Sequence, residues 1–254
     1  PSQGNNNISV VIDEKTAGEV KDYFGKPVLE QIKNSGTINA QGSTVLFKAE
    51  AIPGLFARAI NLDGFVKAKK IEQKDGVIQL VADNDIEIKG RLEATRMSLE
   101  AKGANSSIVS SGHLEAEDLI ELSASGAIKS LGVLSAVNLI EEGASFQLGG
   151  TSSIENASME NDDNAVVLDS GDYSGTYTDA ADIIINTDAV ITLRGNTVFR
   201  VDDNSDGTGA FKMNQGSSIA GNGYNLSLYA SDDSSLRSIS GAGNLSLFPS
   251  QAGS

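Results

Sequence analysis

The stretch DDNSDGTG at 202–209 is the part of the sequence whose spacing best suits a metal ion. Asp202, Asn204 and Asp206, followed by a glycine, match the opening of a calcium-binding loop, in which oxygen atoms at alternate positions surround the cation. The twelfth position of such a loop is a bidentate glutamate, and here it is Met213. We therefore expect at most weak calcium binding at these three residues. A simple turn between two strands is the alternative interpretation.

His113 is the only histidine of the chain, which also contains no cysteine. Ser-His-Asp and Cys-His catalysis need these residues, and a zinc site without them would have to be built from carboxylates alone. His113 lies between Gly112 and Leu114 in a repeated pattern, at a position that we expect to be exposed. The sequence therefore predicts no catalytic or cofactor-binding residue and, apart from the weak calcium loop, no metal ligand.

Asn186, Thr187 and Asp188 raise one enzymatic alternative, because this triplet resembles a motif of the polygalacturonase family. Aspartate pairs, a second feature of that family, are at 162–163, 202–203 and 232–233. The family's Gly-His-Gly and Arg-Ile-Lys motifs are missing. We therefore expect a protein that is not an enzyme, with a polysaccharide-cleaving enzyme as the alternative.

Composition argues against one class of partner and indicates which side chains form the core. The 254 residues carry a formal net charge of -15, which repels phosphate backbones and makes a nucleic-acid partner improbable. Hydrophobic residues make up 39% of the chain but aromatic residues only 5%, and there is no tryptophan. We expect a core of small, branched side chains in thin, regular layers.

A five-residue pattern of glycine, any residue, an aliphatic residue, any residue and alanine recurs through the first half. Its glycines are 28, 26, 22 and 20 residues apart, at Gly36, Gly64, Gly90, Gly112 and Gly132. A second short apolar run follows each copy, for example TVLFKA at 44–49 and DLIELSA at 118–124. These runs alternate with a period of two and are too short for helices, so they predict strands.

The second half repeats a related unit with more polar residues. SSIAGNGYNLSLYA at 217–230 is echoed by RSISGAGNLSLFPS at 237–250, with the two LSL triplets 19 residues apart. A unit of about 20 residues with short strands and Gly or Asn corners is typical of a solenoid of β coils. The predicted fold is therefore all-β, a parallel β-helix, and we expect 1–160 and 161–254 to form one continuous rod.

Two segments interrupt the pattern near the N-terminal third. Residues 13–27 place apolar side chains at helical spacing, which indicates either a short amphipathic helix or a hairpin packed on the coil. Residues 52–62 carry Pro53 at a possible helix start, with Leu55, Phe56, Ala59 and Ile60 on one face. We expect helical or loop excursions at about 13–30 and 51–62.

Order and spacing over the first half resemble the filamentous haemagglutinin-type exoproteins that bacteria export by two-partner secretion. The resemblance is carried by ISVVID at 8–13, IKNSGTINAQGSTVLFKAEA at 32–51 and the stretch 60–94, and it extends to about residue 140. One departure is Ser43, where the family usually has a second glycine. The family's secretion domain is not visible and the chain begins with Pro1, so we expect a segment of a longer protein.

The resemblance implies a right-handed parallel β-helix and export through a partner barrel in the outer membrane. It also implies a role in adhesion or extracellular fibres. We accordingly expect a secreted, structural or adhesive rod at the bacterial surface, whose partners are further copies of itself, head to tail, or a ligand on a host or neighbouring cell. The chain ends, 1–12 and 245–254, are the expected junctions, because strand edges at the ends of such a rod are unpaired.

Overall fold

The computed structural model describes residues 8–12, 21–50, 58–70, 75–160, 165–179, 181–201, 208–231 and 234–249. These residues form parallel strands stacked into a β-helix, as predicted. They contain no helix, and therefore none that could cross a bilayer. The chain divides into two compact units, residues 1–127 and 128–254. The expected boundary at 160 and 161 falls inside the second unit, and the continuity of 1–160 with 161–254 stays a prediction.

The first unit contains three strands in each of its early coils, and in its later coils two of the three merge into one long bent strand. Its strands are β1 (Ile8–Ile12), β2 (Glu30–Asn34), β3 (Thr37–Asn39), β4 (Thr44–Ala49), β5 (Arg58–Leu62), β6 (Phe65–Ala68), β7 (Val77–Ala82), β8 (Ile86–Ile88), β9 (Arg91–Ala101), β10 (Ile108–Ser110) and β11 (His113–Ala124). Strand β12 (Ala127–Ser130) spans the boundary between the two units.

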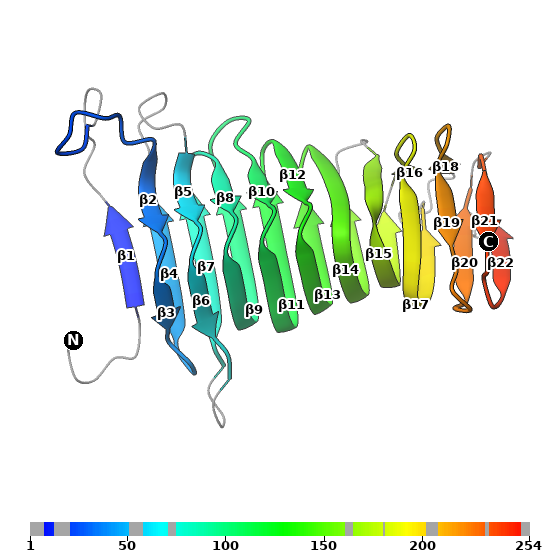
Figure 1. Cartoon of the computed structure of the whole chain (residues 1–254), viewed down its shortest axis with the longest axis horizontal. Helices are drawn as coiled ribbons and strands as arrows, with labels where there is room; N and C mark the ends of the chain where they lie inside the picture. The colour runs from blue at the N-terminus through cyan, green and yellow to red at the C-terminus, as the bar shows by residue number, and fades with distance from the viewer. Residues whose placement is uncertain are drawn as a thin grey trace. The chain divides into compact units, whose positions relative to one another are not determined.

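The strands of the first unit belong to three walls of parallel strands, and Figure 1 shows them stacked coil after coil. The first wall is β2, β5, β8 and β10; the second is β3, β6 and the first parts of β9 and β11. The third wall is β1, β4, β7 and the last parts of β9 and β11. Every strand is therefore paired with the coil before or after it in register.

Side chains of one kind stack along each wall because the register is conserved from coil to coil. The pattern's aliphatic position is buried in successive coils, and so is its alanine. The inward columns of the first unit are Ile32–Ile60–Ile86–Ile108, Val66–Leu92–Leu114, Ala68–Ala94–Ala116 and Phe47–Leu80–Leu99–Leu122. Apart from Phe47 and Met97, the apolar core of this unit consists of the small and branched side chains that composition predicts.

The glycines of the pattern mark a corner where successive coils approach one another closely. The amide of Arg91 donates to the carbonyl of Gly64 at 2.9 Å, and the amide of His113 donates to that of Gly90 at 2.9 Å. A Cβ atom added at Gly90 would lie 1.8 Å from the carbonyl oxygen of Gly64. Close backbone approach, and not an unusual φ angle, therefore requires glycine at this corner.

The expected excursions have a mixed outcome. Residues 58–62, expected within a helix, form strand β5, because Ile60 and Leu62 stack in register on Ile86 and Ile88. The helical interpretation of this part is wrong, and residues 51–57 lie outside the described residues. Residues 21–27 form a tight turn closed by an antiparallel bridge between Lys21 and Pro27, which agrees with the hairpin alternative.

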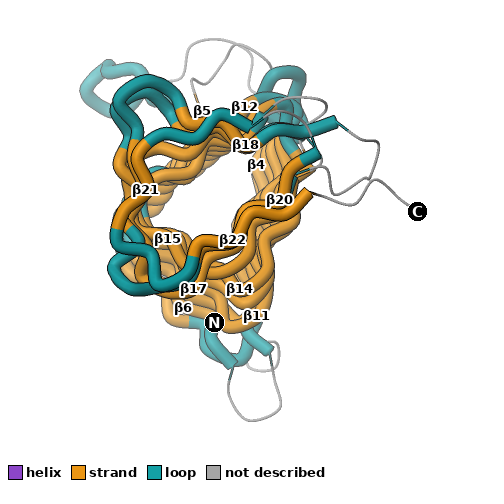
Figure 2. The backbone as a smooth tube through the Cα atoms, turned by 90° about the vertical axis from the view of Figure 1, so that its right-hand side faces the viewer, coloured by secondary structure: helices purple, strands orange, loops and turns teal. Residues whose placement is uncertain are grey.

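The second unit has longer bent strands at its start and short ones at its end. Its strands are β13 (Val133–Glu142), β14 (Ser145–Glu160), β15 (Val166–Asp179), β16 (Ile183–Ile185), β17 (Val190–Arg200), β18 (Phe211–Met213), β19 (Ser218–Ala220), β20 (Leu226–Ala230), β21 (Ser238–Ser240) and β22 (Leu245–Pro249). In the end view, β18, β21 and the paired strands β20 and β22 border one interior from different sides (Figure 2). Pairings β16–β18, β19–β21 and β20–β22 continue the parallel stacking.

Aromatic side chains fill much of the second unit's interior, which composition does not predict. The rings of Tyr173, Tyr177, Phe199 and Phe211 form a series with centroids 6.0, 5.4 and 5.3 Å apart. The Tyr177 hydroxyl donates to Ser152 Oγ at 2.9 Å and the Tyr173 hydroxyl to the Leu148 carbonyl at 2.8 Å. Burial raises the pKa of both tyrosines, so both hydroxyls remain hydrogen-bond donors.

The close contact at this corner predicts that substitution by alanine lowers stability at Gly90 but not at Gly36, a glycine at the same position of the pattern. We expect Gly90→Ala to lower the free energy of unfolding by about 2–3 kcal/mol, because the methyl group cannot fit beside the Gly64 carbonyl. Gly36→Ala is the matched control, since its Cβ would have Asn34 Oδ1 as nearest atom, at 3.8 Å. Urea unfolding of both variants measures the difference. Equal stability of the two would contradict the role assigned to the corner.

Candidate functional site

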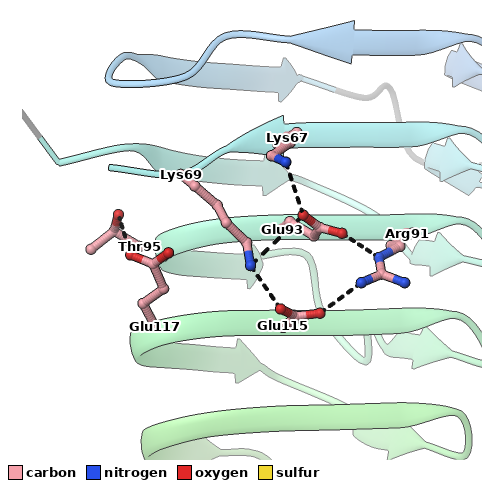
Figure 3. A network of polar contacts seen from close by, with 7 residues as sticks. All are labelled: Lys67, Lys69, Arg91, Glu93, Thr95, Glu115 and Glu117. Carbon is pink, nitrogen blue, oxygen red and sulfur yellow. Dashed lines mark hydrogen bonds and ion pairs between the residues drawn. The ribbon is translucent and has the colours of Figure 1, made fainter. Parts of the chain in front are cut away.

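A cluster of charged side chains lies on the outer face of the first unit, across three successive coils (Figure 3). The fourth position of the repeated pattern is Lys67 in β6, Glu93 in β9 and Glu115 in β11, and these residues are register partners. Lys69 follows β6, and Arg91 begins β9. Parallel pairing therefore brings side chains that are 22 to 26 residues apart in the sequence into one polar cluster.

Glu93 is the centre of the cluster, and its side chain is only 9% exposed. The ammonium groups of Lys67 and Lys69 lie 3.7 and 3.8 Å from its Oε2 atom, and Arg91 Nε pairs with its Oε1 atom. A carboxylate this far removed from water needs such partners, because burial of an unpaired charge is strongly unfavourable.

Glu115 connects the same cations to the next coil. Lys69 Nζ donates to its Oε1 atom at 2.7 Å, and Arg91 Nη2 donates to its Oε2 atom at 2.8 Å. The hydrogen bond from Lys69 lowers the pKa of Glu115 below its usual value, against a smaller effect of burial. The same hydrogen bond raises the pKa of Lys69 above its usual value. Both groups are therefore held in their charged forms at neutral pH.

The cluster is close to neutral as a whole, which limits what it can do chemically. Glu117, whose Oε2 atom lies 3.5 Å from the Thr95 hydroxyl, adds a third carboxylate beside the three cations. A carboxylate that its partners keep ionised is a poor proton donor at neutral pH. The arrangement acts mainly as a set of ionic links between β6, β9 and β11.

His113 lies in β11 with its side chain exposed, as expected from its place in the pattern. Its register partner on the neighbouring coil is Arg91.

Asn186, Thr187 and Asp188 form the corner between β16 and β17. The Asn186 side-chain amide donates to Asp169 Oδ1 at 2.9 Å, and its carbonyl oxygen accepts the Thr187 amide at 2.9 Å. Asp188 adopts a positive φ of 58°, which a short polar residue tolerates, and its amide donates to the Gln215 carbonyl. The triplet thus builds a turn in this fold, in which the Asn186 side chain binds the Asp169 carboxylate and the Thr187 amide.

Asp202, Asn204 and Asp206 lie outside the described residues, as do the aspartate pairs at 162–163, 202–203 and 232–233. Calcium binding at 202–206 stays a prediction. Within the described ranges, no three His, Asp or Glu side chains are grouped so that they could hold a metal ion.

An outward stack of side chains on the second unit was not anticipated from the sequence. Arg200, Tyr229 and Phe248 are register partners on β17, β20 and β22. The Arg200 guanidinium lies 4.5 Å from the centre of the Tyr229 ring, which stacks on Phe248 with centroids 4.7 Å apart. The sequence does contain a signal for this stack, because Tyr229 and Phe248 each follow directly after one of the repeated LSL triplets.

Comparisons of the chain with protein-family models, with curated proteins and with solved structures find no match. The class that the fold defines is a parallel β-helix, and its function has to be argued from the residues of this chain.

The lowered pKa of Glu115 gives a pH-dependent prediction. A lowered folded-state pKa contributes stability above the ordinary value of 4.5, and this is lost as pH falls through the folded-state value. We expect Glu115→Gln to lower the free energy of unfolding at pH 7 by about 0.5–1 kcal/mol, a modest value because solvent screens the pair. At an acidic pH below the folded-state pKa of Glu115, the difference from the parent should shrink towards zero.

Urea titrations at the two pH values measure this effect. Glu121→Gln is the matched control, because Glu121 is an exposed residue of the same strand. An equal deficit of Glu115→Gln at both pH values would show that lost packing, and not lost charge, is responsible.

Proposed function

We propose that this chain is a structural and adhesive segment of a secreted bacterial surface exoprotein of the filamentous haemagglutinin type, and that it is not an enzyme. It acts outside the cell or at the cell surface, after export through a partner barrel in the outer membrane. It associates with further copies of itself or with a ligand on another cell.

The observation that carries this proposal is the parallel pairing of strands from coil to coil within each unit. Each coil contributes backbone hydrogen bonds to the coils on both sides, and aliphatic or aromatic columns fill the interior. Many weak bonds arranged in parallel resist bending and local opening together, because no coil can leave without exposing the columns of its neighbours. Such a segment is suited to hold a surface at a distance.

The side chains on the outer surface support a role in binding other molecules more than a role in catalysis. Ion pairs on the first unit and the Arg200–Tyr229–Phe248 stack on the second present fixed charged and aromatic groups. The net charge of -15 keeps such a surface soluble at high local concentration. The repeated sequence pattern resembles the named exoproteins most closely in residues 8–94, which supports the same class.

A second candidate is a polysaccharide-cleaving β-helix enzyme, and one observation favours it. Glu93, Arg91 and Lys69 gather acidic and basic side chains on one face of the first unit, as such an enzyme requires. The pairing of Glu115 with Lys69 and Arg91 weighs against it, because the lowered pKa of Glu115 keeps this carboxylate ionised and unable to donate a proton at neutral pH.

One two-part experiment separates the two candidates. Display of the chain on a non-adherent bacterium should increase cell–cell aggregation or attachment to an epithelial monolayer, compared with display of an unrelated domain. Purified protein should release no new reducing ends or unsaturated uronates from polygalacturonate, pectin or alginate, with or without calcium. Sugar release that Glu93→Gln abolishes would establish the second candidate, and unchanged adhesion would reject the first.

A further inference from the structure

Two aromatic rings stand exposed on a turn of the first unit. Tyr23 is 97% exposed and Phe24 is 81% exposed, and they contact one another edge to face with centroids 5.4 Å apart. Among the residues that the structure describes, no other large apolar side chain is more than 57% exposed. In Figure 1 the blue segment that carries them projects away from β2. We call Tyr23 and Phe24 the aromatic tip. Exposed apolar groups of this kind often mark a surface that contacts a protein or a membrane.

The turn holds the aromatic tip in one position before any partner is bound. Asp22 Oδ1 accepts hydrogen bonds from the Phe24 and Lys26 amides, both at 2.9 Å. The Asp22 amide donates to the Lys26 carbonyl at 2.8 Å, and Gly25 provides the positive φ of 76° that the turn needs. A turn that is already ordered loses little conformational freedom on binding, so the rings are pre-organised for insertion.

The small size of the turn argues against a protein groove as its partner. A stable protein interface covers about 800 Å² on each side and draws on many residues. Here the turn is closed between Asp22 and Lys26, and its two rings project from it. A bilayer needs no complementary shape, because its interfacial region yields around an inserted side chain. The aromatic tip therefore suits a membrane surface better than a folded protein partner.

The polar groups of the turn argue against a sugar. A sugar bound to an aromatic ring also needs hydrogen-bond partners for its hydroxyl groups, because polar groups removed from water without partners are unfavourable. Between residues 22 and 26 the polar side chains are those of Asp22, Tyr23 and Lys26. Asp22 Oδ1 is already bonded to two amides, and the Asp22 carbonyl accepts the Gly25 amide at 3.0 Å. Few groups of the turn are left for hydroxyls.

The side chains of the turn match the interfacial region of a phospholipid bilayer. A tyrosine ring prefers this region because its apolar body and its hydroxyl are both satisfied there, and a phenylalanine ring reaches the apolar side of it. Lys26 is exposed beside the rings and can keep its ammonium group among the lipid phosphates while its stem lies against the acyl chains. Insertion to a depth of about 5–10 Å, as for other interfacial groups, needs only the tip of the turn.

Net charge decides which kind of bilayer suits this chain. The formal charge of -15 is repelled by anionic lipid, and at physiological salt this repulsion acts over about 8 Å. A zwitterionic surface imposes no such repulsion. Anionic lipids are concentrated in the leaflet that faces the cytoplasm, so the outer face of an animal cell is the less charged one.

We propose that the aromatic tip inserts into the interfacial region of a zwitterionic phospholipid bilayer on another cell. This inference rests on the proposed adhesive role and names the class of its partner. A single tip binds weakly, because it buries only two rings. Several copies displayed on one cell would bind the same membrane much more tightly, since each further contact is made within one assembly.

A fluorescent reporter at the tip tests insertion directly. Because the chain has no tryptophan, Phe24→Trp introduces a single indole at the tip. Its emission should shift to shorter wavelength when phosphatidylcholine vesicles are added, and lipids with a nitroxide near the head group should quench it. Leu131→Trp is the matched control, since Leu131 is 41% exposed and lies elsewhere on the chain. Its emission should not change.

Vesicle binding measures the contribution of the two rings. Co-sedimentation with phosphatidylcholine vesicles should show that Tyr23→Ser with Phe24→Ser weakens binding by at least about tenfold, because two apolar groups are no longer removed from water. Leu131→Ser should bind as the parent does. Circular dichroism and thermal unfolding check that each variant is folded. Binding that survives the double substitution, or that requires phosphatidylserine in the vesicles, would contradict the assignment.

The outcomes for the tip and for the proposed function can be told apart. A parent chain that binds no vesicle and a Phe24→Trp reporter that does not respond overturn the membrane contact. If the displayed chain still attaches to epithelial cells, and protease treatment of those cells abolishes attachment, the partner is a protein and the adhesive function stands. Vesicle binding by a chain that does not increase attachment when displayed would reject the adhesive function and leave the membrane contact in place.

Discussion

The close approach of successive coils at the glycine corner is the constraint on which the rest of the structure depends. Carbonyl and amide groups of neighbouring coils meet at 2.9 Å where Gly64 and Gly90 turn the chain, and a side chain there would separate them. Once this spacing is set, the walls that follow must pair in register. The inward columns and the outward ion pairs are consequences of that register, because pairing aligns residues of successive coils along each wall.

The same register is satisfied by two different interiors. Aliphatic and alanine columns fill the first unit, whereas hydrogen-bonded tyrosines and phenylalanines fill much of the second. A tyrosine can be buried there because carbonyl and hydroxyl groups of neighbouring coils lie within reach of its oxygen. Parallel pairing therefore determines which side chains face the interior. It does not determine whether an inward position holds an aliphatic or an aromatic residue.

The fold class could be predicted because the corner glycine and its aliphatic and alanine partners repeat. The first wall could not, since its strands Ile86–Ile88 and Ile108–Ser110 have three residues each, too few for a period to be visible. Residues 58–62 were misassigned for a related reason: apolar residues in a short run fit a helical face as well as a strand. The charged cluster was missed because Lys67, Glu93 and Glu115 occupy the pattern's variable position, and only pairing across coils brings them together.

Spacing between the corner glycines of the first half falls from 28 to 20 residues, yet the walls of the first unit remain in register. The number of residues in a coil can therefore change without changing how its strands pair with those of the neighbouring coils. Segments between walls can lengthen, shorten or be exchanged during evolution without disturbing the scaffold beneath. Such a protein can acquire new surface specificities by changing its connections while its framework stays the same.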